Sequence, residues 1–374
     1  GGTAVYDNVS AFEAIVIGFF TVFTLPSGQT FATLVRAWVQ CLGRPTIRRL
    51  LAAGGDGAKS ASCYYRFFSR ARWDFDDLSR WLLIGVLVPL FAPEGLLVFA
   101  CDDTTCGKFG RRVAFASRFR DAVHSTAAHP VLHLAHCWVI ITMQIRLPLW
   151  KHVISFPVMA RLYRIEADCD GDHPFRTRQE LALEMITKIA SWLPGRRIEM
   201  VADGAYPCEA LITKRPANVT FTSRMRSDGA LYDLLVQPRK RPRGRPRQKG
   251  KRLPCPAELA RKAEGWKLVT LVQYGEERQR LIWSKKVLWW RVAKAQPVLL
   301  VIVRDPQGKE DDDFFFTTDV AAQGAHVGEV FASRWGIEEV FREGKQLFGF
   351  SKVQGWRPES VEREAPFAML VLSL

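Results

Sequence analysis

The stretch that decides the fold lies near the end of the chain and reads Ser333-Arg334-Trp335-Gly336-Ile337-Glu338-Glu339-Val340-Phe341-Arg342-Glu343-Gly344-Lys345. It consists mainly of good helix formers and contains no proline, so it is expected to form a helix. At about 100° per residue, Glu338 and Lys345 share a helical face with Arg334, whereas Glu339 points away from that face. A carboxylate between two cations suits a site in which the acid binds a metal ion and the cations hold phosphate oxygens.

The charged stripe also has a plainer interpretation, a solvent-exposed helix face with ion pairs between residues four apart. Two upstream segments favour the site. The apolar run Leu96–Cys101 leads directly into Asp102 and Asp103, and the short apolar run from Ile198 leads into Asp203. A turn would tolerate the first two acids, but carboxylates at the ends of buried strands are costly unless something compensates their charge, and a metal ion does so.

The order of the predicted elements indicates an α/β fold of the ribonuclease-H-like type, with a mixed sheet flanked by helices. The strand from Leu96 is followed by two strands in a meander, an amphipathic helix, the strand before Asp203 and the late helix with Glu338. The further predicted ranges are His133–Pro148 and Ile154–Leu162 for the meander and Arg178–Leu193 for the helix. We assign residues 93–221 and 313–374 to the two parts of this catalytic domain.

Residues 222–312 are predicted to form a β-rich insertion within the catalytic domain. Predicted strands in and beside it are Val219–Ser223, Trp266–Gln273, Arg280–Trp283 and Val298–Val303. Its tryptophans Trp283, Trp289 and Trp290 could stack on an unpaired base, but core packing is the favoured role for each.

The insertion contains a basic loop at residues 238–252, in which nine of fifteen residues are Lys or Arg. Its proline and glycine content excludes regular structure. The candidate DNA-binding residues are Arg243, Arg245, Arg247 and Lys249. Arg243-Gly244-Arg245-Pro246 has the form of a hook that enters a narrow A·T minor groove. The alternative, which we favour, is a flexible loop that contacts phosphates without sequence preference.

Residues 1–92 are predicted to form a mainly helical domain in which basic residues recur. It could read DNA, or it could serve only for packing or dimerisation, because no clean helix-turn-helix signature is present. The chain begins at Gly1 without a methionine and stops inside the apolar run Phe367–Leu374, so we expect terminal elements to be missing from this sequence.

The composition indicates a packed protein with a polyanionic partner. The 374 residues are 48% hydrophobic, and 53 Lys and Arg against 38 Asp and Glu give a net charge of +15, which favours nucleic acid as the partner. The eight cysteines are scattered without a C-x-x-C pair, as expected for buried thiols in a reducing cytoplasm. The apolar runs Ala14–Leu25 and Trp81–Phe91 are too short to span a bilayer.

With these residues in place, the chain resembles the DDE transposases of bacterial insertion sequences, and most of all the branch marked by a Y-R-E-K signature. The spacing R-x3-E-x6-K is met by Arg334, Glu338 and Lys345. The tyrosine position is occupied by Phe331, which keeps the ring and lacks the hydroxyl. A β-rich insertion between the second aspartate and the glutamate is also the layout of this branch.

The resemblance assigns the three acids of the family to positions in this chain. The family's first aspartate directly precedes threonine, which selects Asp103 before Thr104, with Asp102 as the alternative. The second aspartate is Asp203 and the glutamate is Glu338. The resemblance implies that these acids are catalytic and hold two Mg²⁺ ions, for which Mn²⁺ can substitute, about 3.5–4 Å apart.

The activity implied is Mg²⁺-dependent transposition, in which phosphodiester hydrolysis at the transposon end frees a 3′-OH that attacks target DNA. Arg334 and Lys345 would hold phosphates flanking the cut. The implied partners are transposon-end DNA, target DNA and a second copy of the chain in a homodimer on DNA, in the cytoplasm of a bacterium and associated with its nucleoid. Two alternatives stay open: a transposase-derived DNA-binding regulator without catalysis, and a ribonuclease-H-like nuclease without strand transfer.

Overall fold

The structure is a computed structural model that describes residues 2–41, 43–54, 59–110, 112–121, 125–126, 128–147, 150–171, 173–235 and 247–374. The helices are α1 (Gly2–Gly18), α2 (Leu25–Gln40), α3 (Ile47–Gly54), α4 (Ala61–Ser69), α5 (Phe75–Trp81), α6 (Val88–Phe91), α7 (Arg178–Trp192), α8 (Glu209–Thr213), α9 (Pro256–Lys262), α10 (Trp290–Ala293), α11 (Gly324–Ser333), α12 (Gly336–Gln346) and α13 (Pro358–Leu372), with the short helical turns η1 (Phe19–Val22), η2 (Leu82–Leu87) and η3 (Glu166–Asp168). The strands are β1 (Leu97–Gly107), β2 (Ser117–Arg120), β3 (Leu132–Arg146), β4 (Val153–Tyr163), β5 (Ile198–Ala202), β6 (Val219–Arg224), β7 (Lys267–Gln273), β8 (Glu276–Leu288), β9 (Pro297–Arg304) and β10 (Asp313–Thr317).

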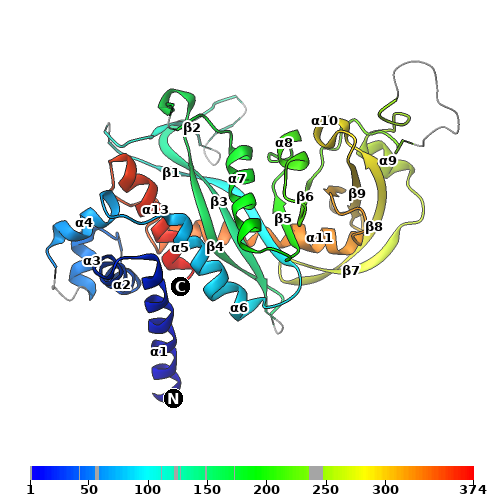
Figure 1. The fold of residues 1–374 in the computed structure, drawn as a ribbon. Coiled ribbons are helices and arrows are strands. Elements are labelled where there is room, and N and C mark those ends of the chain that lie inside the picture. Colours follow the sequence, from blue (N-terminus) through cyan, green and yellow to red (C-terminus); the bar gives the residue numbers. More distant parts are fainter. Residues whose placement is uncertain are drawn as a thin grey trace.

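One mixed sheet joins the strands of the described residues in the order β2-β3-β1-β5-β6-β10-β9-β8-β7, with β4 paired to β3 (Figure 1). The pairs β1–β5 and β5–β6 are parallel, and the other pairs are antiparallel. Helices flank this sheet, so the predicted α/β architecture of a mixed sheet with helices is confirmed, including the helical N-terminal part and the β3–β4 meander.

Strand β1 is longer than its neighbour β5, and this difference positions the acids. We expected β1 to end at Cys101, but it continues to Gly107 along β3. Its parallel pairing with β5 does stop at Cys101, opposite Ala202. Asp102 and Asp103 therefore lie within β1, directly beyond the last pair that β1 makes with β5.

Two faces of the sheet are covered by different helices. Helix α7 packs against β3 and β4, whereas α11 packs over β5, β6 and the strands β7 to β10. Val98 of β1 and Val201 of β5 lie in a core cluster with Val327 and Val330 of α11. Side chains two residues apart on a strand point to the same face of the sheet. The side chains of β1 and β5 that lie an even number of residues from Val98 and Val201 therefore face α11.

The strands of the predicted insertion extend the catalytic sheet. Strand β10, which we did not predict, lies between β6 and β9 and joins β7, β8 and β9 to the sheet. Its sequence Asp313-Phe314-Phe315-Phe316-Thr317 is an aromatic run with the high β propensity of a buried strand. The division into domains at residues 92, 221 and 312 stays a prediction.

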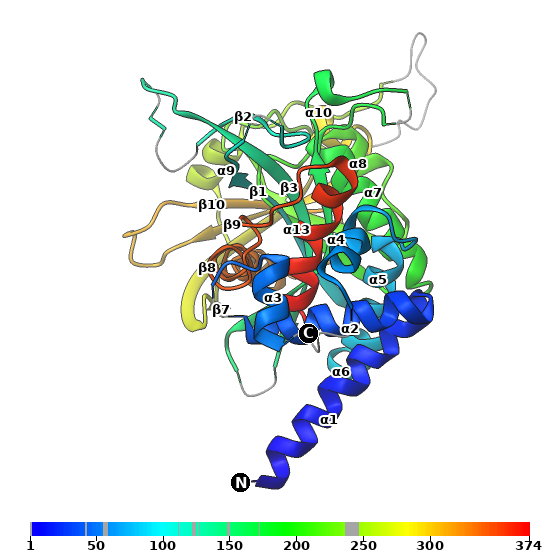
Figure 2. The same cartoon turned by 90° about the vertical axis from the view of Figure 1, so that its left-hand side faces the viewer.

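The N-terminal helices pack around the last helix, α13, which contacts α2, α4 and α5 as well as β4 (Figure 2). Phe367 of α13 is fully buried at the centre of this contact. Its ring lies 5.2–6.1 Å, centroid to centroid, from four aromatic rings of α2 and α4: Phe31, Trp38, Phe67 and Phe68. No helix in the described part of the chain has the length and apolar character needed to cross a membrane.

Replacing Phe367 by alanine should destabilise the whole protein. Deleting a fully buried phenylalanine ring costs about 3–5 kcal/mol, because apolar contacts are lost and a cavity remains. We expect a clearly lowered midpoint of denaturant unfolding, followed by circular dichroism. The matched control is Phe109→Ala, because Phe109 is 99% exposed and its loss should leave the midpoint unchanged. Equal midpoints for the two variants would contradict this account of the core.

Candidate active site

The segment that carries Arg334 and Glu338 is helical but consists of two helices. Helix α11 ends at Ser333, α12 begins at Gly336, and Arg334 and Trp335 form the turn between them. The start of α12 keeps a helix-like turn, because the amide of Glu338 donates a hydrogen bond to the carbonyl of Trp335. Gly336 is required here because a Cβ would lie 2.1 Å from Oγ of Ser155 on β4. The close approach of α12 to the sheet therefore depends on this glycine.

The Arg334 guanidinium joins two of the acids. Nη1 lies 2.7 Å from Oδ2 of Asp102, and Nη2 lies 3.2 Å from Oε1 of Glu338. The Arg334 side chain is largely buried, and its Nε has no hydrogen-bond partner among the described residues. Asp102 and Glu338, which are far apart in the sequence, are thus held by one cation.

Asp102 and Asp203 face the same side of the sheet as Arg334. Asp102 is in step with Val98 on β1, and Asp203 follows Val201 by two residues at the end of β5, so both continue the α11 side. The negative charge of Asp203 also acts on the ionisation of Asp102. Asp102 and Glu338 therefore pair with Arg334, and Asp203 lies on the same face of the sheet near Asp102.

Asp103, the residue predicted as the first acid, points to the opposite face. Its carboxylate lies 3.1 Å from Nη1 of Arg178 at the start of α7 and accepts a hydrogen bond of 3.1 Å from the hydroxyl of Tyr206. The Cys137 thiol also approaches it, at 3.6 Å. Adjacent residues of a strand point to opposite faces, so Asp102 and Asp103 cannot both join Glu338. The sequence could not decide between Asp102 and Asp103, because an all-apolar strand has no alternation of polar and apolar residues to show which side chains face α12.

Arg178 and Tyr206 were not among the predicted site residues. Tyr206 lies in the turn three residues after Asp203, and its hydroxyl ties that turn to β1 from beneath the sheet. Burial raises the pKa of Tyr206 far above its usual range, so the hydroxyl stays a donor. The nearest sequence signal was its position beside Asp203, which alone does not predict a contact with Asp103.

Lys345 and Glu339 lie as the helical-face argument predicted. Nζ of Lys345 donates a hydrogen bond of 2.6 Å to Oγ1 of Thr104, the next residue of β1 on the same face as Asp102. Glu339 points elsewhere and pairs with Arg342 across one helical turn at 3.8 Å. Phe331, at the tyrosine position of the signature, is buried against Phe315 with a centroid distance of 4.6 Å.

The site has an uncompensated negative charge. Burial is the main cause that raises the pKa of Asp102 to about 6; the charges of Asp103 and Asp203 also raise it, while Arg334 and a hydrogen bond from the Asp103 amide lower it. A single guanidinium thus does not offset the cost of burying Asp102 beside other carboxylates.

The donor set fits a hard divalent cation. Asp102, Asp203 and Glu338 offer carboxylate oxygens, which Mg²⁺ prefers. In this conformation the acids stay apart around Arg334, and no three His, Cys, Asp or Glu side chains of the described residues converge closely enough to coordinate one ion.

The predicted DNA-binding residues of the basic loop are only partly described. Arg243 and Arg245 lie outside the described residues, and Arg247 is exposed. Nζ of Lys249 lies 4.0 Å from the ring centre of Tyr232 and 5.3 Å from that of Trp290, so this end of the loop rests on the insertion. Trp289 is buried against Phe316 and belongs to the core.

A pair between a buried glutamate and a partly exposed histidine fixes α11 on the same face. Glu199 of β5 is almost fully buried, and Nε2 of His326 of α11 lies 2.6 Å from its Oε2. The hydroxyl of Thr222 donates to the other carboxylate oxygen at 2.6 Å. Because α11 leads directly into Arg334, we assign His326 and Glu199 as positioning residues for the acids.

This pair should make stability depend on pH. The hydrogen bond to Glu199 raises the pKa of His326 above its usual value. A raised folded-state pKa means that the stabilisation is fully present below the unfolded pKa of about 6.5 and is lost as pH rises through the folded pKa. Wild type should therefore exceed His326→Gln in stability near pH 6, with the difference shrinking at higher pH, as measured by urea midpoints at each pH.

The control for this experiment is His173→Gln, because His173 lies in an exposed pair with Asp170. Its midpoint should follow that of wild type at every pH. A constant difference between wild type and His326→Gln across the pH range would contradict the assigned charge on His326.

Comparison with known proteins identifies the family of the chain. No curated protein matches the chain. The family model described as "DDE superfamily endonuclease" matches residues 19–287, which is well over half of the chain and includes both aspartate-bearing strands. The match supports an activity of the transposase or nuclease type with DNA as the substrate. The chain belongs to the DDE superfamily endonucleases.

Proposed function

We propose that the chain is a DNA transposase whose catalytic acids are Asp102, Asp203 and Glu338 and which depends on Mg²⁺. The observation that carries this proposal is the guanidinium of Arg334, which lies between Asp102 and Glu338 on the face that Asp203 also shares. This geometry supports Asp102, the alternative in the sequence analysis, over Asp103. Asp103, paired with Arg178 and Tyr206, then positions the strand rather than the metal.

The three acids would hold the Mg²⁺ ions, which when bound activate a water nucleophile and neutralise charge on the phosphodiester. The side chains of this chain have separate tasks. Arg334 and Lys345 bring positive charge to the phosphate oxygens beside the cut, and Thr104 orients Lys345 through its hydroxyl.

Strand transfer into target DNA, membership of the Y-R-E-K branch and a dimer on DNA are parts of the same proposal. The spacing of Arg334, Glu338 and Lys345 supports the branch, and the net charge of +15 supports nucleic acid as the partner. A nuclease without strand transfer would share every residue of the site. An assay with paired transposon ends and a target plasmid separates the two, because only a transposase joins the ends to the plasmid.

Cleavage of a labelled duplex with the element's terminal repeat tests the acids. In Mg²⁺, wild type should cut, and Glu338→Gln and Asp102→Asn should lose activity by about a hundredfold or more while still binding the duplex. Glu339→Gln is the matched control, since Glu339 adjoins Glu338 and pairs only with Arg342 among the described residues. It should cut like wild type.

Asp103→Asn decides between the two neighbouring aspartates. If the catalytic acids are Asp102, Asp203 and Glu338, Asp103→Asn keeps substantial cleavage activity. Its main effect is then a lower stability of the folded protein, because the ion pair with Arg178 is lost. The assignment of Asp102 fails if Asp103→Asn abolishes cleavage at unchanged stability while Asp102→Asn retains it. The enzyme proposal itself fails if wild type binds the ends and cuts none of them.

A further inference from the structure

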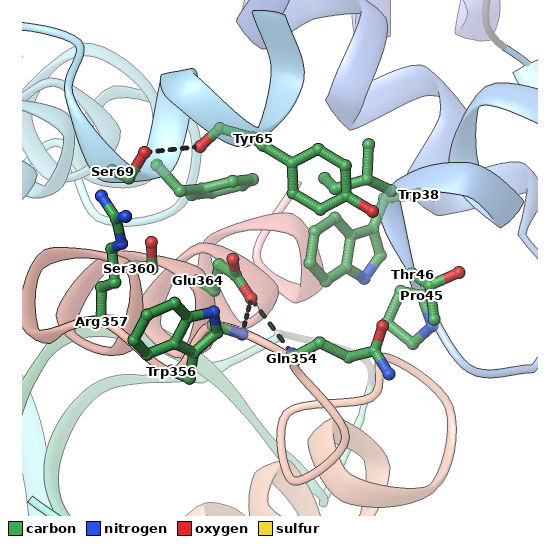
Figure 3. A pocket seen from close by; sticks show the side chains of 13 residues that line it. Trp38, Pro45, Thr46, Tyr65, Ser69, Gln354, Trp356, Arg357, Ser360 and Glu364 are labelled. Carbon is green, nitrogen blue, oxygen red and sulfur yellow. Dashed lines mark hydrogen bonds between the residues drawn. The ribbon is translucent and has the colours of Figure 1, made fainter. Parts of the chain in front are cut away.

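A pocket outside the catalytic face lies between the N-terminal helices and the loop that follows α12 (Figure 3). Its volume is about 270 Å³, just below the ~300–1,000 Å³ of pockets for drug-sized ligands. One wall comes from α2 and α4, and the opposite wall comes from residues 354–357 and α13. A pocket of this size admits one ring system rather than a larger ligand.

The walls of the pocket are aromatic and in part exposed. Tyr65 and Trp38 lie on one side, and Trp356 lies on the other (Figure 3). Tyr65 is 47% exposed and Trp356 is 54% exposed, whereas Trp38 is buried and its indole N–H is bonded to the carbonyl of Phe348 at 2.9 Å. The exposed rings of Tyr65 and Trp356 face the pocket from opposite sides. A third flat ring can occupy the space between them.

The floor of the pocket is polar. Glu364 of α13 accepts hydrogen bonds from the backbone amides of Gly355 at 2.7 Å and Gln354 at 3.2 Å, which fixes the loop that carries Trp356. Burial raises the pKa of Glu364 to about 7, so the carboxyl can also hold a proton and donate. The Gln354 side chain adds an amide, which offers both a donor and an acceptor.

The rim of the pocket is basic. Arg357 lies on the rim with its guanidinium 5.3 Å from the ring centre of Trp356. Arg44 and Lys352 adjoin the other end, where Nε of Arg44 donates to the carbonyl of Lys352 at 3.2 Å. These three parts of the pocket match the parts of a nucleotide. The aromatic walls suit a flat base, the donors and acceptors of the floor suit the polar edge of the base, and the cationic rim suits the phosphate.

We propose that this pocket binds one unpaired base of the DNA substrate, stacked between Tyr65 and Trp356, with Arg357 on its phosphate. The inference rests on the proposed function, which identifies the nucleic acid as DNA. An enzyme that acts on DNA ends encounters bases that are frayed or extruded from the duplex. The pocket is connected to the catalytic face through the loop after α12, because Nζ of Lys108, just beyond β1, donates to the carbonyl of Ser351 in that loop at 3.2 Å.

The test is a binding measurement without metal. The probe is a duplex with a single unpaired 2-aminopurine, compared in EDTA with the fully paired duplex. Stacking of one base on aromatic side chains should give wild type about a tenfold preference for the unpaired probe and quench its fluorescence. Trp356→Ala should lose the preference and the quenching but bind the paired duplex as before, and Trp356→Phe should restore both in large part.

Phe109→Ala is the control, since it removes an exposed ring outside the pocket and should behave as wild type. Equal wild-type affinity for the two probes would overturn the inference, and so would an unchanged preference in both Trp356→Ala and Tyr65→Ala. If Trp356→Ala keeps the preference but dissociates a dimer of the chain, the pocket holds a protein side chain instead. Because no cleavage is measured, loss of the base preference and loss of catalysis are separate results.

Discussion

The arrangement of the proposed catalytic face depends on one largely buried cation. Arg334 lies at the turn between α11 and α12 and pairs with Asp102 of β1 and with Glu338 one helical turn later. Breaking one partner of a buried ion pair leaves an uncompensated charge, which costs more than the pair itself stabilises. The interaction therefore fixes the position of α12 on the sheet, and with it the positions of Glu338 and Lys345. Burial keeps the pKa of Asp102 raised, at about 6, although the charge of Arg334 lowers it.

The second constraint is the unequal length of two parallel strands. Strand β5 ends at Ala202, opposite Cys101, while β1 continues along β3 to Gly107. The carboxylates at 102 and 203 thus leave the sheet at the point where the parallel pairing stops, so they are near one another but not buried under a further strand. Ligand sites in α/β sheets are commonly found beyond the carboxyl ends of parallel strands for this reason. Helix α11, held by the pair of His326 and Glu199, covers the part of this face before the acids.

Much of this could be predicted from the sequence, because most of the signals are local. The helical spacing of Arg334, Glu338 and Lys345 placed them on one face and Glu339 off it, and apolar runs located β3, β4 and β5 closely and the start, but not the end, of β1. The choice between Asp102 and Asp103 could not be predicted, because it depends on which face of β1 meets α12, and a strand buried on both faces shows no alternation. Strand β10 was missed although its aromatic run is a local strand signal; what the sequence does not show is its position between β6 and β9. The contact of Tyr206 with Asp103 likewise depends on how the turn after β5 folds under the sheet.

The N-terminal helices and the catalytic face form one packed unit, and this bears on how DNA binding and cleavage relate. The loop after α12 is held from both sides: Trp38 of α2 donates to the carbonyl of Phe348, and Lys108 beyond β1 donates to that of Ser351. On the far side of the same loop, Phe367 of α13 packs into the aromatic rings of α2 and α4. A displacement of α2 relative to the sheet would break these contacts together, because close-packed aromatic cores do not deform gradually. DNA held by the N-terminal helices would therefore be held at a fixed position relative to Arg334 and the three acids.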